Sequence, residues 1–315
     1  MPLDRHAKRL LDMLAAGGAA GGPELTPLEL RDAMTRMARA VDARDVPIGG
    51  TEERVLGRPG GGGAPLPVRV YTPSSAAGGV SAGLVYFHGG MGVFNNIDTH
   101  DGLCRMLANA SGCRIVSVEY RLAPEHPFPA AVEDSYFAIE WVCGHAAELR
   151  MDPARVAVGG DSHGATLAIV TCQRAKRDGG PRLALQLLLC PVTDLSRESE
   201  SRRAFAEGYF INPATLAWAT ELYAGVGADL ANPMISPLRA GDFAGLPPAH
   251  IHTAEFDPLH DEGKAYADAL VAAGVKVRYA CHEGMIHHFY AMAGAIPAAR
   301  AIVAAVGAGV REVLG

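Results

Sequence analysis

The sequence has no long run of apolar residues and no excess of positive charge. Its 315 residues carry 28 Lys and Arg against 34 Asp and Glu, a formal net charge of −6 at pH 7. No segment is long and uncharged enough to cross a membrane as a helix. Without a basic stripe, the chain also lacks the electrostatic basis for binding a phosphate backbone. We therefore expect neither a membrane partner nor a nucleic-acid partner.

Cysteine is scarce, and its spacing excludes the common cysteine motifs. The six cysteines form no C-x-x-C pair and lie mostly in apolar runs. We expect buried free thiols rather than disulfides or metal ligands, which favours a reducing compartment. The first residues, MPLDRHAKRLLDMLAAGG, lack the apolar core of a secretory signal. A cytoplasmic location is the resulting expectation.

Apolar runs alternate with helical segments from Leu84 onward. The strand candidates are GLVYFH, CRIVSVEY, RVAVGG, LALQLLLC, AHIHTA and VKVRYA. The helical candidates are residues 99–110, 129–149, 164–177, 261–273 and 297–314. Alternation of this kind predicts an α/β fold, with a mostly parallel sheet covered by helices on both faces. Residues 68–71 alternate like a further strand.

Two segments lie outside this alternation. Residues 1–50 read as helices, with Leu10, Leu11 and Leu14 at helical spacing. Residues 196–231 interrupt the strand–helix pattern with a polar stretch and then a helix around residues 213–223. An insertion after a strand often forms part of a lid above the carboxyl ends of the strands, where ligands bind.

A serine between glycines follows one of the apolar strands. The segment VAVGGDSHGATLAIV places Ser162 where a predicted strand becomes a predicted helix. Gly160 and Gly164 relieve the crowding of a sharp turn. Such a turn raises the hydroxyl above the sheet and aims the His163 N–H at a developing oxyanion. The alternative is a tight turn with a small residue in it.

A serine nucleophile needs a base and a carboxylate that orients the base, in the chain order Ser, Asp or Glu, His. Asp257 follows one apolar strand, and His287 lies in a loop after the next. Asp261 is the rival carboxylate, interpreted instead as a helix-start residue. The rival histidines are His282 and His288. These histidines lack partners at metal-ligand spacing, so no metal is expected.

A glycine-rich loop follows an earlier strand, in LVYFHGGMGVF. Successive backbone N–H groups of Gly89, Gly90 and Met91 can collect negative charge without any side chain. The alternative is a flexible turn. Its place after an apolar strand and before the serine turn favours an oxyanion hole.

Taken together, these motifs resemble the hormone-sensitive-lipase-like esterases, a bacterial family of carboxylic ester hydrolases with the α/β-hydrolase fold. The resemblance runs from about Leu84 to His287. It rests on HGGM at His88, YRLAPEHPFPAA from Tyr120, GGDSHG at Gly159, AEFDPLHDEG from Ala254 and GMIHHF at Gly284.

The resemblance implies a serine carboxylesterase that hydrolyses short- to medium-chain esters through an acyl-enzyme, without metal or cofactor. Ser162 would be the nucleophile, Asp257 the orienting carboxylate and His287 the general base. The family's oxyanion donors match Gly90, Met91 and His163 here. Residues 1–50 and about 196–231 would form a helical cap on a catalytic domain of residues 51–315. Members of the family are often monomers or dimers, and of these two states we expect a homodimer through the sheet edge and a nearby helix.

The chain departs from the family pattern at three places. Met91 stands where HGGG has its last glycine, His163 replaces the alanine of GDSAG, and His288 replaces a frequent glycine. A positive φ costs methionine more conformational free energy than it costs glycine. The imidazole of His163 is expected to narrow the pocket or approach the leaving group, and a role as competing base is the alternative.

The walls of the acyl pocket are expected from aromatic and aliphatic residues of the loop and the cap. These side chains either line the pocket or simply pack the cap. They are Met34, Met37, Phe94, Phe205, Tyr209, Phe210 and Leu216.

The same triad also serves amidases, lactonases and carbamate hydrolases, which differ in the leaving group that they prefer. A ligand receptor on this fold is the non-enzymatic alternative, since a fold does not imply a function. Receptors of that kind typically lack a triad member, whereas Ser162, Asp257 and His287 are all present.

Overall fold

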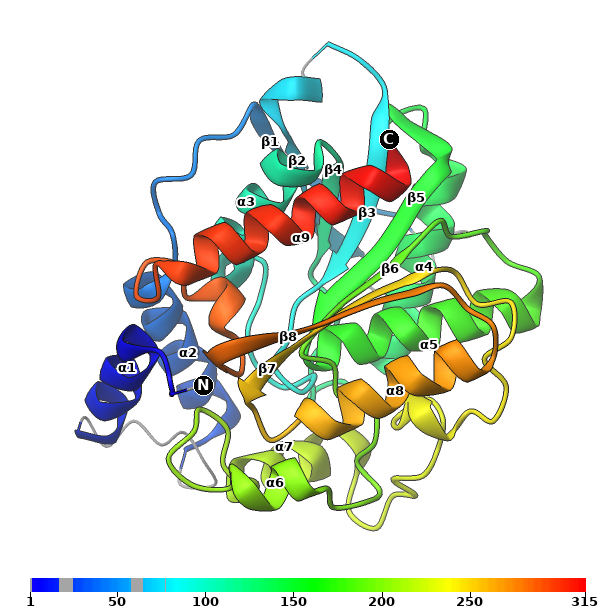
Figure 1. Cartoon of the computed structure of the whole chain (residues 1–315). Coiled ribbons are helices and arrows are strands. Elements are labelled where there is room, and N and C mark those ends of the chain that lie inside the picture. The colour runs from blue at the N-terminus through cyan, green and yellow to red at the C-terminus, as the bar shows by residue number, and fades with distance from the viewer. Residues whose placement is uncertain (1, 17–24, 58–64, 77) are drawn as a thin grey trace.

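The chain folds around one central sheet (Figure 1). The computed structural model describes residues 2–16, 25–57, 65–76 and 78–315. Within these residues the strand order is β1-β2-β4-β3-β5-β6-β7-β8. The strands are β1 (Gly50–Leu56), β2 (Leu66–Thr72), β3 (Ser81–Phe87), β4 (Arg114–Val118), β5 (Met151–Asp161), β6 (Gln186–Leu189), β7 (Ala249–Phe256) and β8 (Val277–Ile286).

The sheet is mostly parallel, as the alternation of strands and helices predicts. β2 pairs antiparallel with both β1 and β4, and all later neighbours pair in parallel. Every residue of β3, β4 and β6 is buried. Strands that are covered on both faces read as continuous apolar runs rather than as alternating ones, because neither face meets water.

Helices cover both faces of the sheet. In Figure 1, α3 and α9 lie on one face of the sheet, and α4, α5 and α8 lie on the other. Each face has its own apolar core, one built with α4, α5 and α8 and the other with α3 and α9. The helices are α1 (Arg5–Ala16), α2 (Pro27–Val41), α3 (Asp101–Ser111), α4 (Ala130–Gly144), α5 (His163–Asp178), α6 (Glu200–Ala204), α7 (Pro213–Ala224), α8 (His260–Ala272) and α9 (Ala298–Leu314).

The connections at the carboxyl ends of the parallel strands carry the sequence motifs. β3 leads into the glycine-rich loop, and β5 ends one residue before Ser162. β7 ends just before Asp257, and β8 ends just before His287. Since β3, β5, β7 and β8 run in parallel, these loops emerge at the same edge of the sheet.

The predicted elements are confirmed with small shifts at their ends. The five helical candidates become α3, α4, α5, α8 and α9, and the helix around residue 213 becomes α7. β8 is longer than predicted and includes His282, because it continues pairing with β7 past a register shift. Among the α-helices and strands of the described residues, two were not predicted: the edge strand β1 and the one-turn helix α6 within the 196–231 insertion.

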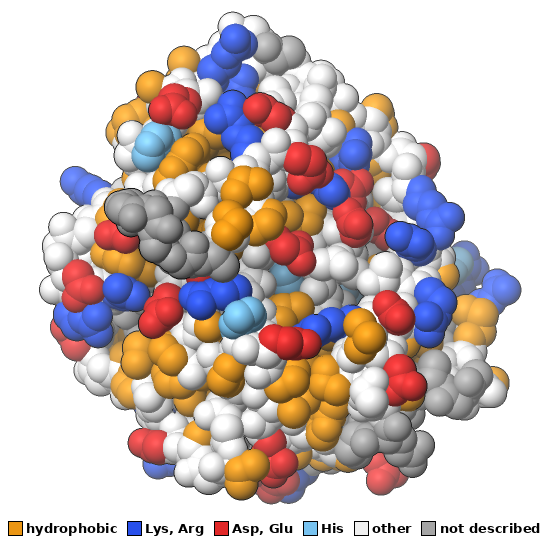
Figure 2. Space-filling view, turned by 180° about the vertical axis from the view of Figure 1, so that it is seen from behind, with side chains coloured by type: hydrophobic (Ala, Val, Ile, Leu, Met, Phe, Trp, Pro, Cys, Tyr) orange, Lys and Arg blue, Asp and Glu red, His pale blue; other side chains and the backbone are white. Residues whose placement is uncertain are grey.

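The surface and the cysteines agree with the composition. All six cysteines are free, four of them buried and two partly buried. On the face shown in Figure 2, basic and acidic side chains lie intermixed. Among the described residues, no helix combines the length and the apolar character that a membrane span requires.

Candidate active site

Ser162 occupies a strained corner between β5 and α5. Its backbone has φ 53° and ψ −121°, outside the regions that L-residues usually adopt. The corner requires glycine on both sides. A Cβ at Gly160 would collide with the backbone of Gly164, and a Cβ at Gly164 would collide with the carbonyl of Phe87. The Ser162 N–H donates to the Leu189 carbonyl at 2.8 Å, which fixes the corner to the neighbouring strand.

The pair of Asp257 and His287 lies at the ends of two adjacent strands. His287 Nδ1 lies 2.8 Å from Asp257 Oδ2, and Asp257 Oδ1 accepts the Leu259 N–H at 2.8 Å. Both side chains are buried, with the carboxylate fully inaccessible and His287 4% exposed. A carboxylate bound in this way selects the imidazole tautomer that leaves Nε2 free to act as a base.

The rival residues have other partners. Asp261 Oδ2 accepts the Ser201 N–H at 2.7 Å and ties α8 to α6. His282 Nε2 lies 3.2 Å from His252 Nδ1, and the two rings stack. Neither Asp261 nor His282 lines the cavity that contains Ser162.

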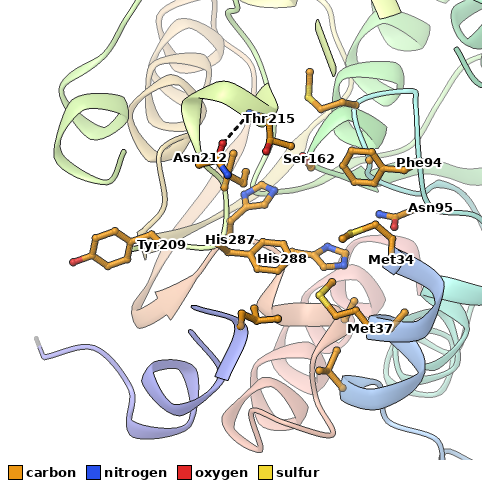
Figure 3. Close-up of a pocket in the computed structure, with 18 of the residues that line it drawn as sticks. Met34, Met37, Phe94, Asn95, Ser162, Tyr209, Asn212, Thr215, His287 and His288 are labelled. Atoms are coloured by element: carbon orange, nitrogen blue, oxygen red, sulfur yellow. Dashed lines mark hydrogen bonds between the residues drawn. The ribbon is translucent and has the colours of Figure 1, made fainter. Parts of the chain in front are cut away.

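The cavity has a volume of about 350 Å³ and is open at one side. Ser162 and His287 both line it, and Figure 3 places them near each other there. Six of the expected wall residues line it too: Met34, Met37, Phe94, Tyr209, Phe210 and Leu216. Phe205 does not. It packs edge-on against Tyr209 and Phe256, with ring centroids 5.0 and 5.7 Å away.

The cavity also contains residues that the sequence reasoning missed. Most come from the helices of the expected cap and from the segment after the glycine-rich loop. They include Leu11, Leu14, Leu30, Asn95, Thr99, Ile211, Asn212, Thr215 and His288. Helical spacing marks the leucines only as one face of an amphipathic helix, which does not distinguish a cavity wall from core packing.

The glycine-rich loop turns sharply beside Ser162. Gly90, Met91 and Gly92 all have positive φ, at 116°, 53° and 70°. The N–H groups of Gly90 and Met91 donate to no described residue, and both residues line the cavity. The geometry departs from the expectation for Gly89, because its N–H donates to Asp161 Oδ1 at 3.0 Å and is already paired.

His163 begins α5, and its side chain turns away from the cavity. The ring is 1% exposed and packs edge-on against Tyr223 at 4.4 Å. Neither ring nitrogen has a hydrogen-bond partner among the described residues. Burial lowers the pKa of His163 to about 3, so the imidazole is neutral. Only the backbone N–H of His163 remains available to the site, and the side chain does not narrow the cavity.

Asp161 is a buried carboxylate with several donors. Its Oδ1 accepts the Tyr86 hydroxyl at 2.9 Å besides the Gly89 N–H, and His100 Nε2 lies 3.1 Å away. His288 Nδ1 lies 3.2 Å from Oδ2. Burial opposes ionisation of this group, but the two histidines more than offset it and hold the pKa of Asp161 well below its usual range.

Two clusters of potential metal ligands occur among the described residues. One contains His100, Asp161 and His288, and the other contains Cys190, Asp257 and His287. Both include hydrogen-bonded pairs already described. Of the three histidines His282, His287 and His288, only the last two belong to these clusters of described residues. His282 pairs with His252 instead.

Comparisons with known proteins agree with this geometry. The family model described as alpha/beta hydrolase fold matches residues 84–291. The carboxylic ester hydrolase LipN of Mycobacterium tuberculosis is 44% identical over 71% of the chain, a match that spans 61% of LipN. The carboxylesterase NlhH of the same species is 40% identical over 94% of the chain and 92% of NlhH.

A solved structure is similar over nearly the whole chain. It is the ester hydrolase EH1AB1 from the metagenome of Lake Arreo, complexed with a derivative of bipyridine phosphonate. The TM-score is 0.94 at 40% identity, over 98% of each chain.

Proposed function

Since the chain belongs to the hormone-sensitive-lipase-like esterases with the α/β-hydrolase fold, we propose that it hydrolyses short- to medium-chain carboxylic esters through a serine acyl-enzyme. The observation that carries the proposal is the buried Asp257–His287 pair, which shares one cavity with Ser162 on its strained corner. Ser162 is the nucleophile, His287 the general base and Asp257 the group that orients the base.

In the first half-reaction, Ser162 Oγ attacks the ester carbonyl carbon while His287 Nε2 takes the hydroxyl proton. The carbonyl oxygen becomes an oxyanion. The donors for it are the N–H groups of Gly90 and Met91, which donate to no described residue, and the N–H of His163 at the start of α5. The intermediate then collapses, the C–O bond to the alcohol breaks, and His287 returns the proton to the leaving alcohol.

In the second half-reaction, water attacks the acyl-enzyme. His287 accepts a proton from the water and later gives it to Ser162 Oγ, so the acid is released and the enzyme is restored. Each bond formed and broken involves only substrate, water and these side chains. A carboxylate at Asp257 stabilises the imidazolium that forms in both halves.

The cavity supports a preference for small esters. Its volume of about 350 Å³ is at the lower end of ordinary ligand pockets. α1, α2 and the segment 208–216 supply much of its lining, which supports the assignment of residues 1–50 and 196–231 as a cap on a catalytic domain of residues 51–315. A cap excludes water from the reacting groups.

Location and assembly belong to the same proposal. Six free thiols favour a reducing compartment, which supports a cytoplasmic enzyme. β8 is the last strand of the sheet among the described residues, and an edge that pairs with no further described strand supports the homodimer expected there.

The test is hydrolysis of p-nitrophenyl esters from acetate to palmitate by the wild type, S162A and H287A. We expect activity on short chains and a loss on the order of a million-fold in S162A. S74A and H282A are the matched controls, because Ser74 is exposed and His282 lies outside the cavity. A folded wild type that is inert on the whole panel would contradict the proposal. Equal activity in S162A would overturn the nucleophile assignment.

A further inference from the structure

A second carboxylate–imidazole pair lies beside the proposed triad. His288 Nδ1 is 3.2 Å from Asp161 Oδ2, just as its neighbour His287 is held by Asp257. His288 therefore follows the proposed base in sequence and has its own buried carboxylate. The mechanism above gives this second imidazole no role.

The orientation of the His288 ring is fixed on several sides. Asp161 holds Nδ1, Phe210 stacks on the ring face at 6.0 Å with an interplanar angle of 12°, and His100 packs against its edge at 5.2 Å. The other ring nitrogen, Nε2, has no hydrogen-bond partner among the described residues and is not fully buried. His288 lines the cavity, and Figure 3 shows its ring on the side formed by Met34 and Met37.

The backbone conformation of His288 shows that the turn alone does not explain why a histidine occupies this position. It has φ 64° and ψ 8°, the left-handed region that glycine adopts without cost. Any L-residue there is strained, and strain of this kind clusters at functional sites. Glycine would satisfy the turn, so the imidazole contributes something that the turn does not need.

The protonation state determines what Nε2 can do. Burial lowers the pKa of His288, although Asp161 opposes this shift. The ring is therefore neutral near pH 7. Since the carboxylate of Asp161 requires a donor at Nδ1, the proton lies on Nδ1 and Nε2 is an acceptor. The cavity thus presents an oriented acceptor on a wall formed largely of methionine, leucine and phenylalanine side chains.

We propose that His288 Nε2 accepts a hydrogen bond from a hydroxyl group on the ester, so that the site favours hydroxylated esters over unsubstituted ones. The inference rests on the proposed esterase function and names its substrate class. A hydroxyl that enters an apolar cavity loses its hydrogen bonds to water. An acceptor already fixed in place restores one of them without further ordering, whereas an ester without the hydroxyl leaves Nε2 unpaired.

The test compares matched esters by pH-stat. Ethyl hexanoate is measured against ethyl 3-hydroxyhexanoate and ethyl 5-hydroxyhexanoate, and butyl butyrate against 4-hydroxybutyl butyrate. The first set places the hydroxyl on the acyl chain and the second on the alcohol. Each kcat/KM is divided by the alkaline hydrolysis rate of the same ester, which removes intrinsic reactivity. We expect at least one hydroxylated ester to equal or exceed its unsubstituted partner.

The informative variant is His288→Asn. Asparagine tolerates the left-handed conformation, and its amide can donate to Asp161 as Nδ1 does, but the side chain ends before the position of Nε2. We expect the ratio of kcat/KM for the favoured hydroxylated ester to that for its partner to fall about tenfold. The ratio is insensitive to a general loss of activity. His282→Asn, the same change outside the cavity, should leave the ratio at the wild-type value.

The outcomes separate the two proposals. If the wild type hydrolyses none of these esters and none of the p-nitrophenyl panel, the esterase function fails. If it hydrolyses the unsubstituted esters but disfavours every hydroxylated one, this inference is overturned and the esterase function stands. An unchanged ratio in a folded His288→Asn variant would also overturn this inference and leave the esterase function standing. The matched esters measured on the wild type test the inference even if the His288→Asn variant does not fold.

Discussion

At the scale of single residues, the site concentrates backbone strain. Met91, Ser162 and His288 have φ of 53°, 53° and 64°, and all three line the same cavity. A left-handed conformation costs an L-residue roughly 1–2 kcal/mol. Such costs persist where the surrounding structure fixes the backbone for a purpose, here the orientation of an N–H group at Met91, of the hydroxyl of Ser162 and of the imidazole of His288.

Met91 allows this idea to be tested. In Met91→Gly the backbone N–H remains and positive φ becomes free of cost, so we expect kcat on p-nitrophenyl acetate to stay within about threefold of the wild type or to rise. KM for longer acyl chains should change, because the Met91 side chain lines the cavity. Steady-state kinetics across the ester panel measures both. A loss of tenfold or more on acetate would show that the side chain itself shapes a productive cavity.

Sequence reasoning reached some residues of the site and missed others for a physical reason. Ser162, Asp257 and His287 follow strands, and the carboxyl ends of parallel strands meet, so their proximity could be predicted. The contact between Asp161 and His288 joins residues 127 positions apart and depends on side-chain orientation. Phe205 illustrates the same limit, because period and type do not show which way an aromatic ring in a loop turns.

At the scale of elements, Arg31 of α2 makes hydrogen bonds to the proposed oxyanion loop and to the segment that follows β4. Arg31 donates through Nε to the Val93 carbonyl at 2.8 Å and through Nη2 to the Ala123 carbonyl at 2.7 Å. It also pairs with Glu125 at 2.7 Å. The helix begins with a capping box at Thr26, which sets its start but not its position on the catalytic domain. Arg31 holds the first half of α2 in place, and the Val41 carbonyl at its other end accepts the Gly294 N–H at 2.8 Å.

Arg31→Ala should therefore disturb the cavity more than the fold. We expect KM for medium-chain esters to rise several-fold, because Met34 and Met37 lose their fixed place, while the free energy of unfolding falls by only about 1–2 kcal/mol. Arg36→Ala is the control, since Arg36 lies on the exposed side of the same helix. Kinetics and urea unfolding on both variants measure the two effects. Equal KM values for the two variants would show that α2 does not depend on Arg31.

The elements that were not predicted are those with weak apolar patterns. In β1 only Leu56 is buried. The sequence of this strand, GTEERVL, carries charged residues, which are typical of the exposed edge of a sheet. α6 has five residues and only Ser201 buried, so no helical period can develop. β3, β4 and β6 are buried throughout and could be predicted from sequence alone.

At the scale of the whole molecule, the fold buries several histidines in the neutral state. Burial lowers the pKa of His88, His163 and His252 to about 3 each, with neighbouring histidines adding to the shift for His88 and His252. An unfolded chain protonates these rings near pH 6.5. Their folded pKa values are depressed, so the stability that they contribute is complete above pH 6.5 and is lost as the pH falls toward 3.

The share of one of these rings in the acid sensitivity of the chain can be measured separately. Between pH 7 and pH 5, each buried neutral histidine should cost the fold about 2 kcal/mol of unfolding free energy. His163→Ala keeps the backbone N–H that the mechanism needs and removes the ring. We expect its unfolding free energy to fall by about 2 kcal/mol less than that of the wild type over this pH interval, although the variant starts lower at pH 7 because of the space left beside Tyr223. Urea unfolding at both pH values measures the difference. His126→Ala, which removes an exposed ring, should lose as much as the wild type. If His163→Ala also loses as much as the wild type, protonation of His163 does not contribute to the acid sensitivity.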